Sequence, residues 1–189
     1  MMAPVTARLV VPVSDADHAA GPRTAPVTLV EYGDYECPYC GEAHPIVQQV
    51  QDEFGEQLRF VFRHFPLTTI HPHAEHAAEA AESAAEQNKF WPMHDMLFEH
   101  QDALEDEDLV QYAEDLGLDA SRVEREILEQ AHAPRIRRDF IGGVRSGVNG
   151  TPTFFINGVR HDGPFDFESL REAIDLALAE AVDHAPRRR

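Results

Sequence analysis

Two cysteines dominate the chemistry that this chain could carry out. Cys37 and Cys40 are the only cysteines among 189 residues, and they enclose Pro38 and Tyr39 directly after the apolar run 27–32. A strand that leads into a helix at this pair would place one sulfur at the helix N-terminus, where unpaired N–H groups and the helix dipole stabilise a thiolate. Pro38 suits the first helical position, because its ring presets φ and its missing N–H has no intrahelical partner there. The spacing therefore favours a reactive dithiol.

The same Cys-x-x-Cys spacing also supplies half of many structural zinc sites. Further ligands would have to come from the 11 histidines or from acidic residues, and His44 is the nearby histidine on the same predicted helix. No histidine pair in a loop completes the set, and we assign no metal ligand, including among His71, His73 and His76. An inert structural disulfide is a third interpretation. It is disfavoured because a chain of this length, with 43% hydrophobic residues, buries a core without a crosslink.

A second motif lies far downstream, in the sequence Gly-Thr-Pro-Thr-Phe-Phe-Ile-Asn-Gly at 150–158. Taken alone, it indicates an edge strand that begins at a proline and ends in an Asn-Gly hairpin turn. Together with Cys-Pro-Tyr-Cys after a strand, it closely resembles the DsbA-like thiol-disulfide oxidoreductases of the thioredoxin superfamily. The resemblance implies a thioredoxin fold, which is an α/β fold with a central mixed β-sheet flanked by helices, here with a helical insertion. It also implies disulfide exchange with protein substrates and no cofactor.

The resemblance and the helix-dipole argument together suggest roles for the motif residues. Cys37 is the expected attacking thiolate, and Cys40, deeper in the helix, is expected to resolve the mixed disulfide. In the family, the bond that corresponds to Thr151-Pro152 is cis and lies beside the cysteines, where the backbone of the preceding residue binds an extended substrate. The predicted substrate-binding residues are Thr151, Pro152, Pro38 and Tyr39.

Glu31 is a third match to the family, which carries a buried acid beneath the disulfide. Strand alternation places Leu29, Glu31 and Gly33 on one face. A buried carboxyl there would have a raised pKa and could exchange a proton with Cys40. The alternative is an exposed glutamate on an edge strand.

The residues around Cys37 predict its acidity. Strongly oxidising family members carry a histidine at the position of Tyr39, and a tyrosine cannot add positive charge there. Asp34, Glu36 and Glu42 would oppose the thiolate if they lay close in space. We therefore expect a Cys37 pKa nearer to thioredoxin's value of about 7 than to DsbA's value of about 3.5.

The chain is predicted to form a single domain over 1–189. Its thioredoxin core should span about 24–66 and 149–183, interrupted by a helical insertion at about 67–148. The apolar periodicity predicts the remaining elements. These are strands at 9–13, 27–32, 58–65, 153–156 and 159–161, a loop at 14–25, and helices at 38–54 (stopped by Gly55), 104–116, 119–130, 133–144 and 166–182.

Charge and hydropathy restrict the partners. The formal net charge is −18, which disfavours binding to nucleic acid or to anionic membranes. No targeting segment and no run of 18 apolar residues is present, so no stable membrane insertion is predicted. The sequence as given suggests a cytoplasmic protein, or an extracytoplasmic one if it is part of a longer chain. The expected partners are protein thiols or disulfides and an unidentified redox partner.

Two rival functions are compatible with the same fold. One is a redox-sensing or regulatory binding module, attached in relatives to a membrane transporter. The other is a glutathione-using isomerase or transferase of the superfamily, but those proteins usually carry a serine in place of the cysteine pair.

Overall fold

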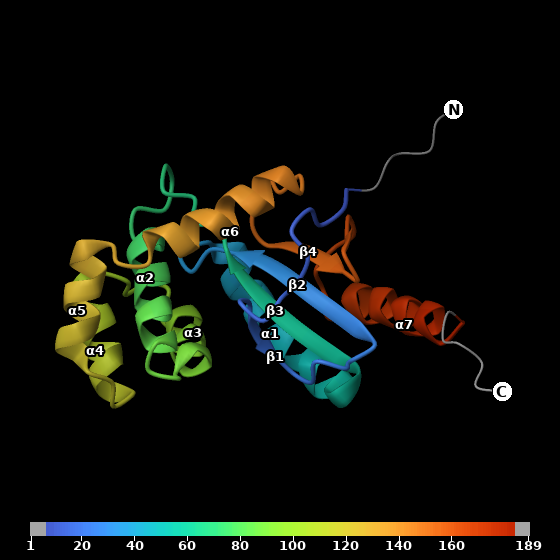
Figure 1. Cartoon of the computed structure of the whole chain (residues 1–189), viewed down its shortest axis with the longest axis horizontal. Helices are drawn as coiled ribbons and strands as arrows, with labels where there is room; N and C mark the ends of the chain where they lie inside the picture. Colours follow the sequence, from blue (N-terminus) through green and yellow to red (C-terminus); the bar gives the residue numbers. More distant parts are fainter. Residues whose placement is uncertain (1–6, 184–189) are drawn as a thin grey trace.

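The computed structural model describes residues 7–183 and places a five-stranded mixed sheet at the centre (Figure 1). The strand order is β1-β3-β2-β4-β5, with β2 and β3 parallel and the other pairs antiparallel. The predicted α/β class with a mixed sheet is therefore confirmed, while 1–6 and 184–189 of the predicted domain lie outside the described residues. The strands are β1 (His18–Ala20), β2 (Val27–Gly33), β3 (Leu58–His64), β4 (Thr153–Ile156) and β5 (Val159–Arg160).

The β2-α1-β3 unit positions the cysteine pair. Helix α1 (Pro38–Phe54) begins at the proline of the motif and ends before Gly55, whose φ of 45° is a conformation that suits glycine. The chain then returns through a short 3-10 turn (Gly55–Gln57) to β3, which pairs with β2 in parallel. This crossover places the N-terminus of α1 at the carboxyl end of the central strand.

The two faces of the sheet carry separate apolar clusters. On one face, Leu29 of β2 packs with α1 and with α7 (Phe167–Asp183). On the other face, Val30 and Tyr32 pack with Phe140 of α6 (Ala133–Arg145) and with the segment that precedes β1. Alternate residues of β2 thus serve opposite faces, as the period of a strand requires.

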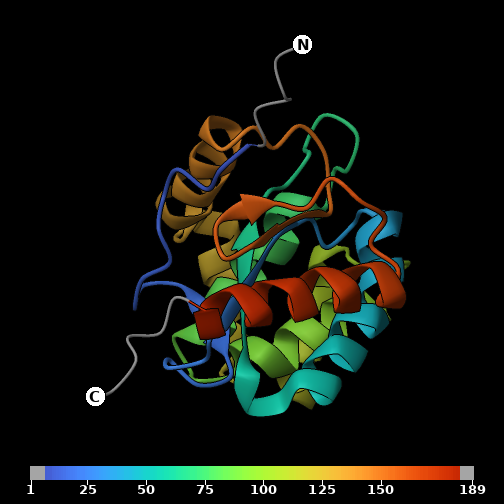
Figure 2. The same ribbon diagram turned by 90° about the vertical axis from the view of Figure 1, so that its right-hand side faces the viewer.

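Five helices lie between β3 and β4 in the sequence. They gather at the end of the sheet opposite to α7, except for α6, which crosses over the sheet (Figures 1 and 2). Many small residues of α2 are buried, which lets its neighbours approach closely. The first four of these helices are α2 (Ala74–Ala85), α3 (Phe90–Glu99), α4 (Asp106–Asp115) and α5 (Ala120–Glu129).

The predicted first strand at 9–13 is wrong. Strand β1 falls instead in the segment that we predicted to be a loop, where it pairs with the edge of β3. The earlier segment has a different role, because Leu9 and Val13 pack on the second apolar cluster and the Val10 N–H donates to Ser146 Oγ at 2.9 Å. Apolar alternation alone does not distinguish a paired strand from an extended segment that packs on a helix.

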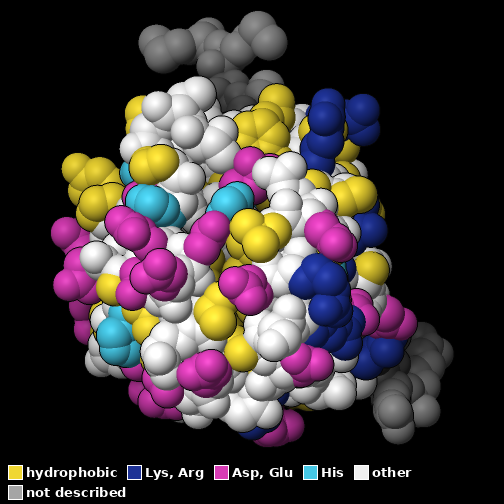
Figure 3. Space-filling model, turned by 90° about the vertical axis from the view of Figure 1, so that its left-hand side faces the viewer, with side chains coloured by type: hydrophobic (Ala, Val, Ile, Leu, Met, Phe, Trp, Pro, Cys, Tyr) yellow, Lys and Arg dark blue, Asp and Glu magenta, His cyan; other side chains and the backbone are white. Residues whose placement is uncertain are grey.

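The surface reflects the acidic composition. On the face that lies at the left of Figure 1, acidic side chains are spread widely, while basic ones gather along one side (Figure 3). Within residues 7–183, no helix has the length and apolar character that would let it cross a bilayer.

Candidate active site

Cys37 is the N-cap residue of α1, with extended backbone angles and Pro38 in the first helical turn. Its carbonyl accepts hydrogen bonds from the N–H groups of Cys40 and Gly41, at 3.0 and 3.1 Å. The predicted placement at the helix N-terminus is therefore present, and both cysteines are free in the structure.

The two sulfurs differ sharply in acidity. The pKa of Cys37 is lowered to about 5, chiefly by a hydrogen bond from the Cys40 side chain, with help from the Thr151 side chain and from the backbone N–H groups of Tyr39 and Cys40. Burial raises the pKa of Cys40 well above its ordinary value. Both residues are almost fully buried, since Cys37 is 4% exposed and Cys40 is 0% exposed.

Thr151 and Pro152 lie directly beside the pair. The Thr151-Pro152 peptide bond is cis, and the Cys37 thiol donates to the Thr151 carbonyl at 3.4 Å. The Thr151 hydroxyl oxygen is buried and has no hydrogen-bond partner among the described residues, so it is available to the Cys37 thiolate. The sequence predicted a role for the Thr151 backbone but not for this hydroxyl. Tyr39 is 62% exposed, and Pro38 is also exposed.

Glu31 is buried in β2, which is an internal strand of the sheet, so the alternative of an exposed edge glutamate is wrong. Burial, followed by the charge of Cys37, raises the pKa of Glu31 to about 8. Within residues 7–183, its Oε1 atom has no hydrogen-bond partner. Glu31 and Cys40 also influence each other electrostatically, because the charge of Glu31 contributes to the raised pKa of the Cys40 thiol. The carboxyl is thus mostly protonated near neutral pH.

Replacing Glu31 by glutamine should stabilise the reduced protein increasingly as pH rises. Below pH 4.5, the ordinary carboxyl pKa, Glu31 is protonated in both the folded and the unfolded states and costs nothing. Between 4.5 and about 8 only the unfolded state ionises fully, so the wild type loses stability that the glutamine variant keeps. The gain in unfolding free energy should be of the order of 3 kcal/mol at pH 7.

Urea unfolding of both proteins at several pH values measures this difference. The variant Glu53→Gln, which changes an exposed acid on α1, is the matched control and should follow the wild type throughout. A gain for Glu31→Gln that does not change between pH 4 and 8 would contradict the assignment of the raised pKa to Glu31.

Two of the three acids that we expected to oppose the thiolate, Asp34 and Glu36, are held by the loop after β3, while Glu42 is exposed on α1. Asp34 accepts hydrogen bonds from the Leu67 N–H and from His71 Nδ1, both at 2.8 Å. Glu36 accepts one from the His73 N–H at 2.6 Å. These bonds occupy both carboxylates, and the pKa of about 5 lies below the value that we expected from the sequence.

Gln101, which follows α3 in the sequence, braces the segment around Cys37. Its side-chain amide donates to the carbonyls of Tyr35 and Cys37, at 2.7 and 2.9 Å. A Cβ atom added at Gly41 would lie 2.0 Å from Gln101 Oε1, so only glycine leaves room for this brace. No motif marks Gln101, because its partners are backbone atoms far away in the sequence.

A double-mutant cycle tests the brace. In a Gln101→Ala background, Gly41→Ala should stabilise the protein by about 0.5–1 kcal/mol, which is the usual gain from replacing a helical glycine. In the wild-type background the new methyl group displaces the Gln101 amide, and the loss of two hydrogen bonds, each worth about 1 kcal/mol, should cancel or reverse that gain. Thermal or urea unfolding of the four proteins gives the coupling energy. Equal effects of Gly41→Ala in the two backgrounds would show that Gln101 does not brace this segment.

Comparisons with known proteins place this geometry in context. Residues 14–176 match a family model described as thioredoxin. A crystal structure of oxidised BdbD from Bacillus subtilis is similar with a TM-score of 0.82 and 24% identity, covering 93% of this chain and 98% of that one. A thioredoxin-like oxidoreductase from Silicibacter pomeroyi DSS-3 is similar with a TM-score of 0.77 and 27% identity, covering 87% and 93%.

Curated relatives are more similar in sequence but much longer. A protein named Na(+)/H(+) antiporter NhaA 3 from Salinispora tropica is 52% identical over 174 residues, which are 92% of this chain and 26% of the relative. One named Na(+)/H(+) antiporter NhaA 1 from Mycobacterium sp. (strain KMS) is 45% identical, over 91% of this chain and 28% of the relative. The chain thus spans about a quarter of the length of the curated relatives that it matches.

Proposed function

The chain belongs to the thioredoxin family and is DsbA-like, and from this premise we propose that it exchanges disulfides with protein substrates through Cys37 and Cys40. One observation carries the proposal. Cys37 is the N-cap residue of α1 and has a pKa lowered to about 5, while the thiol of Cys40 is buried and has a raised pKa. This asymmetry separates an attacking thiolate from a resolving thiol.

In the reducing direction, the Cys37 thiolate attacks one sulfur of a substrate disulfide. A mixed disulfide forms, and the other substrate sulfur leaves as a thiolate. Cys40 then loses its proton and attacks the Cys37 sulfur, which releases the second substrate thiolate and leaves a Cys37–Cys40 disulfide. Two electrons pass to the substrate, and the oxidising direction runs the same steps in reverse.

Glu31 is our candidate for the proton acceptor of Cys40. Its pKa of about 8 lets it take up or release a proton near neutral pH, and its buried Oε1 has no competing partner in the part of the chain that the structure describes. A carboxyl in this position supplies the base that the buried Cys40 thiol lacks.

The substrate surface is proposed to consist of Thr151, Pro152, Pro38 and Tyr39. Thr151 and Pro152 lie where an extended peptide would approach the Cys37 sulfur, since the Thr151 carbonyl already contacts that sulfur. The exposed ring of Tyr39 offers an apolar surface beside it.

Two assays with purified protein test the proposal. Insulin reduction in the presence of dithiothreitol reports the reducing direction, and oxidation of reduced ribonuclease in a glutathione buffer reports the oxidising one. The wild type should accelerate at least one of them. A protein that accelerates neither while keeping its fold would be a binding module rather than an oxidoreductase.

The second candidate is a redox-sensing or regulatory module associated with a membrane transporter. The names of the curated relatives favour it, because proteins named as antiporters contain a region that is 45–52% identical to this chain. Under this proposal the Cys37–Cys40 redox state would alter the transport activity of a partner. The test is antiport in vesicles that contain such a relative in its oxidised form, in its reduced form, or with serine in place of the cysteine that matches Cys37. Equal transport by all three forms would exclude a regulatory module.

A further inference from the structure

A second group of polar side chains lines a cavity of about 410 Å³ beside α1 and α3. We call it the α1–α3 cavity. His44 and Gln48 reach it from α1, and His94 and Asp95 reach it from α3. Its remaining lining residues are Ala20, Val47, Gln51, Asp52, Phe60 and Trp91.

The spacing of these groups is that of metal ligands. A nitrogen of His44, a nitrogen of His94 and a carboxylate oxygen of Asp95 all lie within 4.8 Å of one another. His44 Nε2 is 3.5 Å from Asp95 Oδ1, which is longer than a charge-assisted hydrogen bond. Bonds of about 2.1 Å from zinc to nitrogen and oxygen, in tetrahedral arrangement, separate neighbouring ligand atoms by about 3.4 Å. The His44–Asp95 separation therefore matches the edge of a coordination tetrahedron.

Both imidazoles are held in the form that binds metals. Burial lowers the pKa of His44 and lowers that of His94 well below its ordinary value, so both rings are neutral near pH 7. The Gln48 amide nitrogen lies 3.2 Å from His44 Nε2, and since an amide nitrogen only donates, Nε2 is the nitrogen without a proton. The Gln48 amide must move aside before a metal takes this lone pair.

His94 also has a partner of the kind that orients metal ligands. Its Nδ1 contacts the buried hydroxyl of Tyr35 at 3.1 Å, which leaves the other ring nitrogen for a metal. Histidine ligands usually bond through their second nitrogen to such an outer partner.

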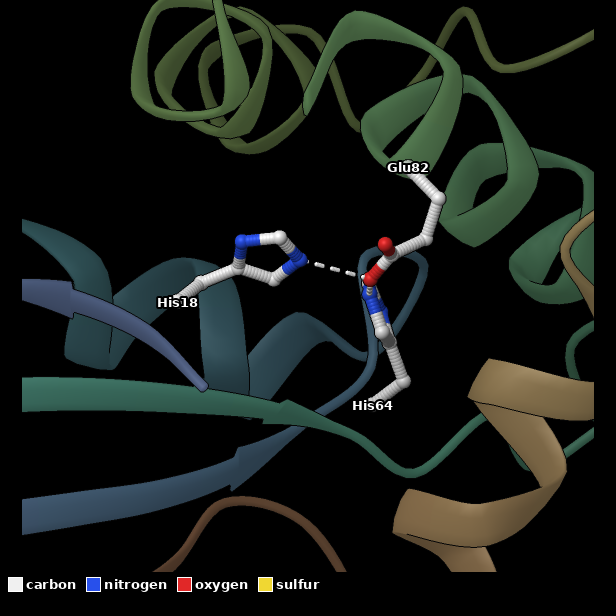
Figure 4. Close-up of side chains that lie close together, drawn as sticks. All are labelled: His18, His64 and Glu82. Atoms are coloured by element: carbon white, nitrogen blue, oxygen red, sulfur yellow. Dashed lines mark hydrogen bonds and ion pairs between the residues drawn. The ribbon is translucent and has the colours of Figure 1, made fainter. Parts of the chain in front are cut away.

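A second cluster of two histidines and a carboxylate provides an internal comparison. His18 Nε2 and His64 Nε2 both contact Oε1 of Glu82, at 2.8 and 2.7 Å (Figure 4). These are hydrogen-bond lengths, too short for the edges of a coordination tetrahedron. Arg135 Nε lies 3.6 Å from the same oxygen and places a positive charge beside it. This cluster is a hydrogen-bonded network, and it lacks the spacing and charge of the α1–α3 cavity.

We propose that His44, His94 and Asp95 form a binding site for a divalent transition metal of the zinc class, which ties α1 to α3. Water or a neighbouring side chain of the cavity completes the coordination. Two nitrogen donors and one carboxylate suit zinc, whereas calcium and magnesium require oxygen ligands. The site is separate from the dithiol chemistry, although His44 lies one helical turn after Cys40.

The test is a zinc titration against a chromophoric chelator, followed by thermal unfolding with and without zinc. It uses the double variant Cys37→Ser/Cys40→Ser, because thiolates of a reduced Cys-x-x-Cys pair bind zinc themselves. This parent also makes the result independent of disulfide exchange. We expect one zinc ion per chain and a rise in unfolding temperature.

Removing a ligand in this parent should weaken the affinity for zinc at least about tenfold. Asp95→Asn is the principal variant, because its side chain is 45% exposed and tolerates change, and His44→Gln is the second. His18→Gln is the matched control from the hydrogen-bonded cluster and should bind zinc as the parent does. A parent that binds no zinc at several-fold excess would overturn the proposal. The same holds if Asp95→Asn binds zinc as tightly as the parent.

Discussion

Replacing Cys37 by serine is expected to lower disulfide exchange to the rate measured without protein, in both the insulin and the ribonuclease assays. The reason is that a serine hydroxyl at the N-cap of α1 cannot form the mixed disulfide on which both directions depend. Circular dichroism and thermal unfolding would establish that the fold is retained. Residual exchange above background in this variant would show that another group attacks the substrate.

Cys40→Ser is the matched control for the same pair. This variant keeps the acidic sulfur of Cys37 but lacks the thiol that resolves the mixed disulfide, so substrate should accumulate on Cys37. Non-reducing electrophoresis and mass spectrometry detect that adduct. If Cys37→Ser accumulated the adduct instead, the roles of the two cysteines would be reversed.

The elements that the sequence predicted best are those whose signals are local. Helix α1 has the predicted bounds, because Pro38 starts it and Gly55 ends it through their own backbone preferences. The parallel crossover followed from the strand periods on either side of α1. Strand alternation placed Glu31 on the same face as Leu29, and the resemblance to the family predicted that it is buried, as it is in the structure.

The features that the sequence did not predict depend on contacts between distant segments. Strand β1 forms because β3 offers it an edge, and nothing within 14–25 indicates that pairing. Asp34 accepts hydrogen bonds from His71 and from the loop before α2, and nothing near Asp34 in the sequence indicates these contacts. Gln101 donates hydrogen bonds to the carbonyls of Tyr35 and Cys37. Its position in the sequence does not distinguish it from other polar residues in loops.

The proposed metal site also depends on contacts between segments that are distant in the sequence. The sequence offered His44 as a possible partner of the cysteines, because they share a helix. The structure turns His44 toward α3 instead, where His94 and Asp95 supply the other donors. Three candidate ligands that lie on two helices, with no spacing pattern between them, leave no motif in a sequence.

The acidity of Cys37 leads to the second large effect. The absorbance of the reduced protein at 240 nm should titrate with a midpoint near pH 5, because hydrogen bonds stabilise its thiolate. The same bonds stabilise the reduced folded protein relative to the unfolded chain. This contribution is fully present above pH 9.0, the ordinary thiol pKa, and is lost as pH falls through about 5. Since the stabilised species is the reduced one, a lower pKa also makes the disulfide more oxidising.

Alkylation with iodoacetamide tests the difference in reactivity between the two sulfurs. The pH of the reaction determines how large the difference in their rates should be. At pH 7, Cys37 is almost fully ionised, but a thiolate of such low pKa is also a weaker nucleophile, by roughly 60-fold over four pKa units. That penalty would nearly offset the advantage in ionisation over an ordinary thiol of pKa 9.0, but the raised pKa of Cys40 leaves Cys37 the faster of the two at pH 7. At pH 5 the advantage in ionisation is larger, and because the pKa of Cys40 lies above the ordinary thiol value, Cys37 should react at least on the order of 100-fold faster than Cys40.

The alkylation rate of each cysteine should therefore be measured over a range of pH by peptide mass spectrometry, because one rate at one pH does not separate acidity from access. The rate for Cys37 should level off above about pH 6, while the rate for Cys40 should still be rising at pH 9. Tyr39→His provides the matched variant, because a cationic imidazole beside the helix N-terminus would lower the Cys37 pKa further. A wild-type midpoint near 7 would mean that the hydrogen bonds from Cys40 and Thr151 do not stabilise the thiolate. An unchanged midpoint in Tyr39→His would mean that the residue between the cysteines does not tune the acidity of Cys37, and that the bonds around its sulfur do so alone.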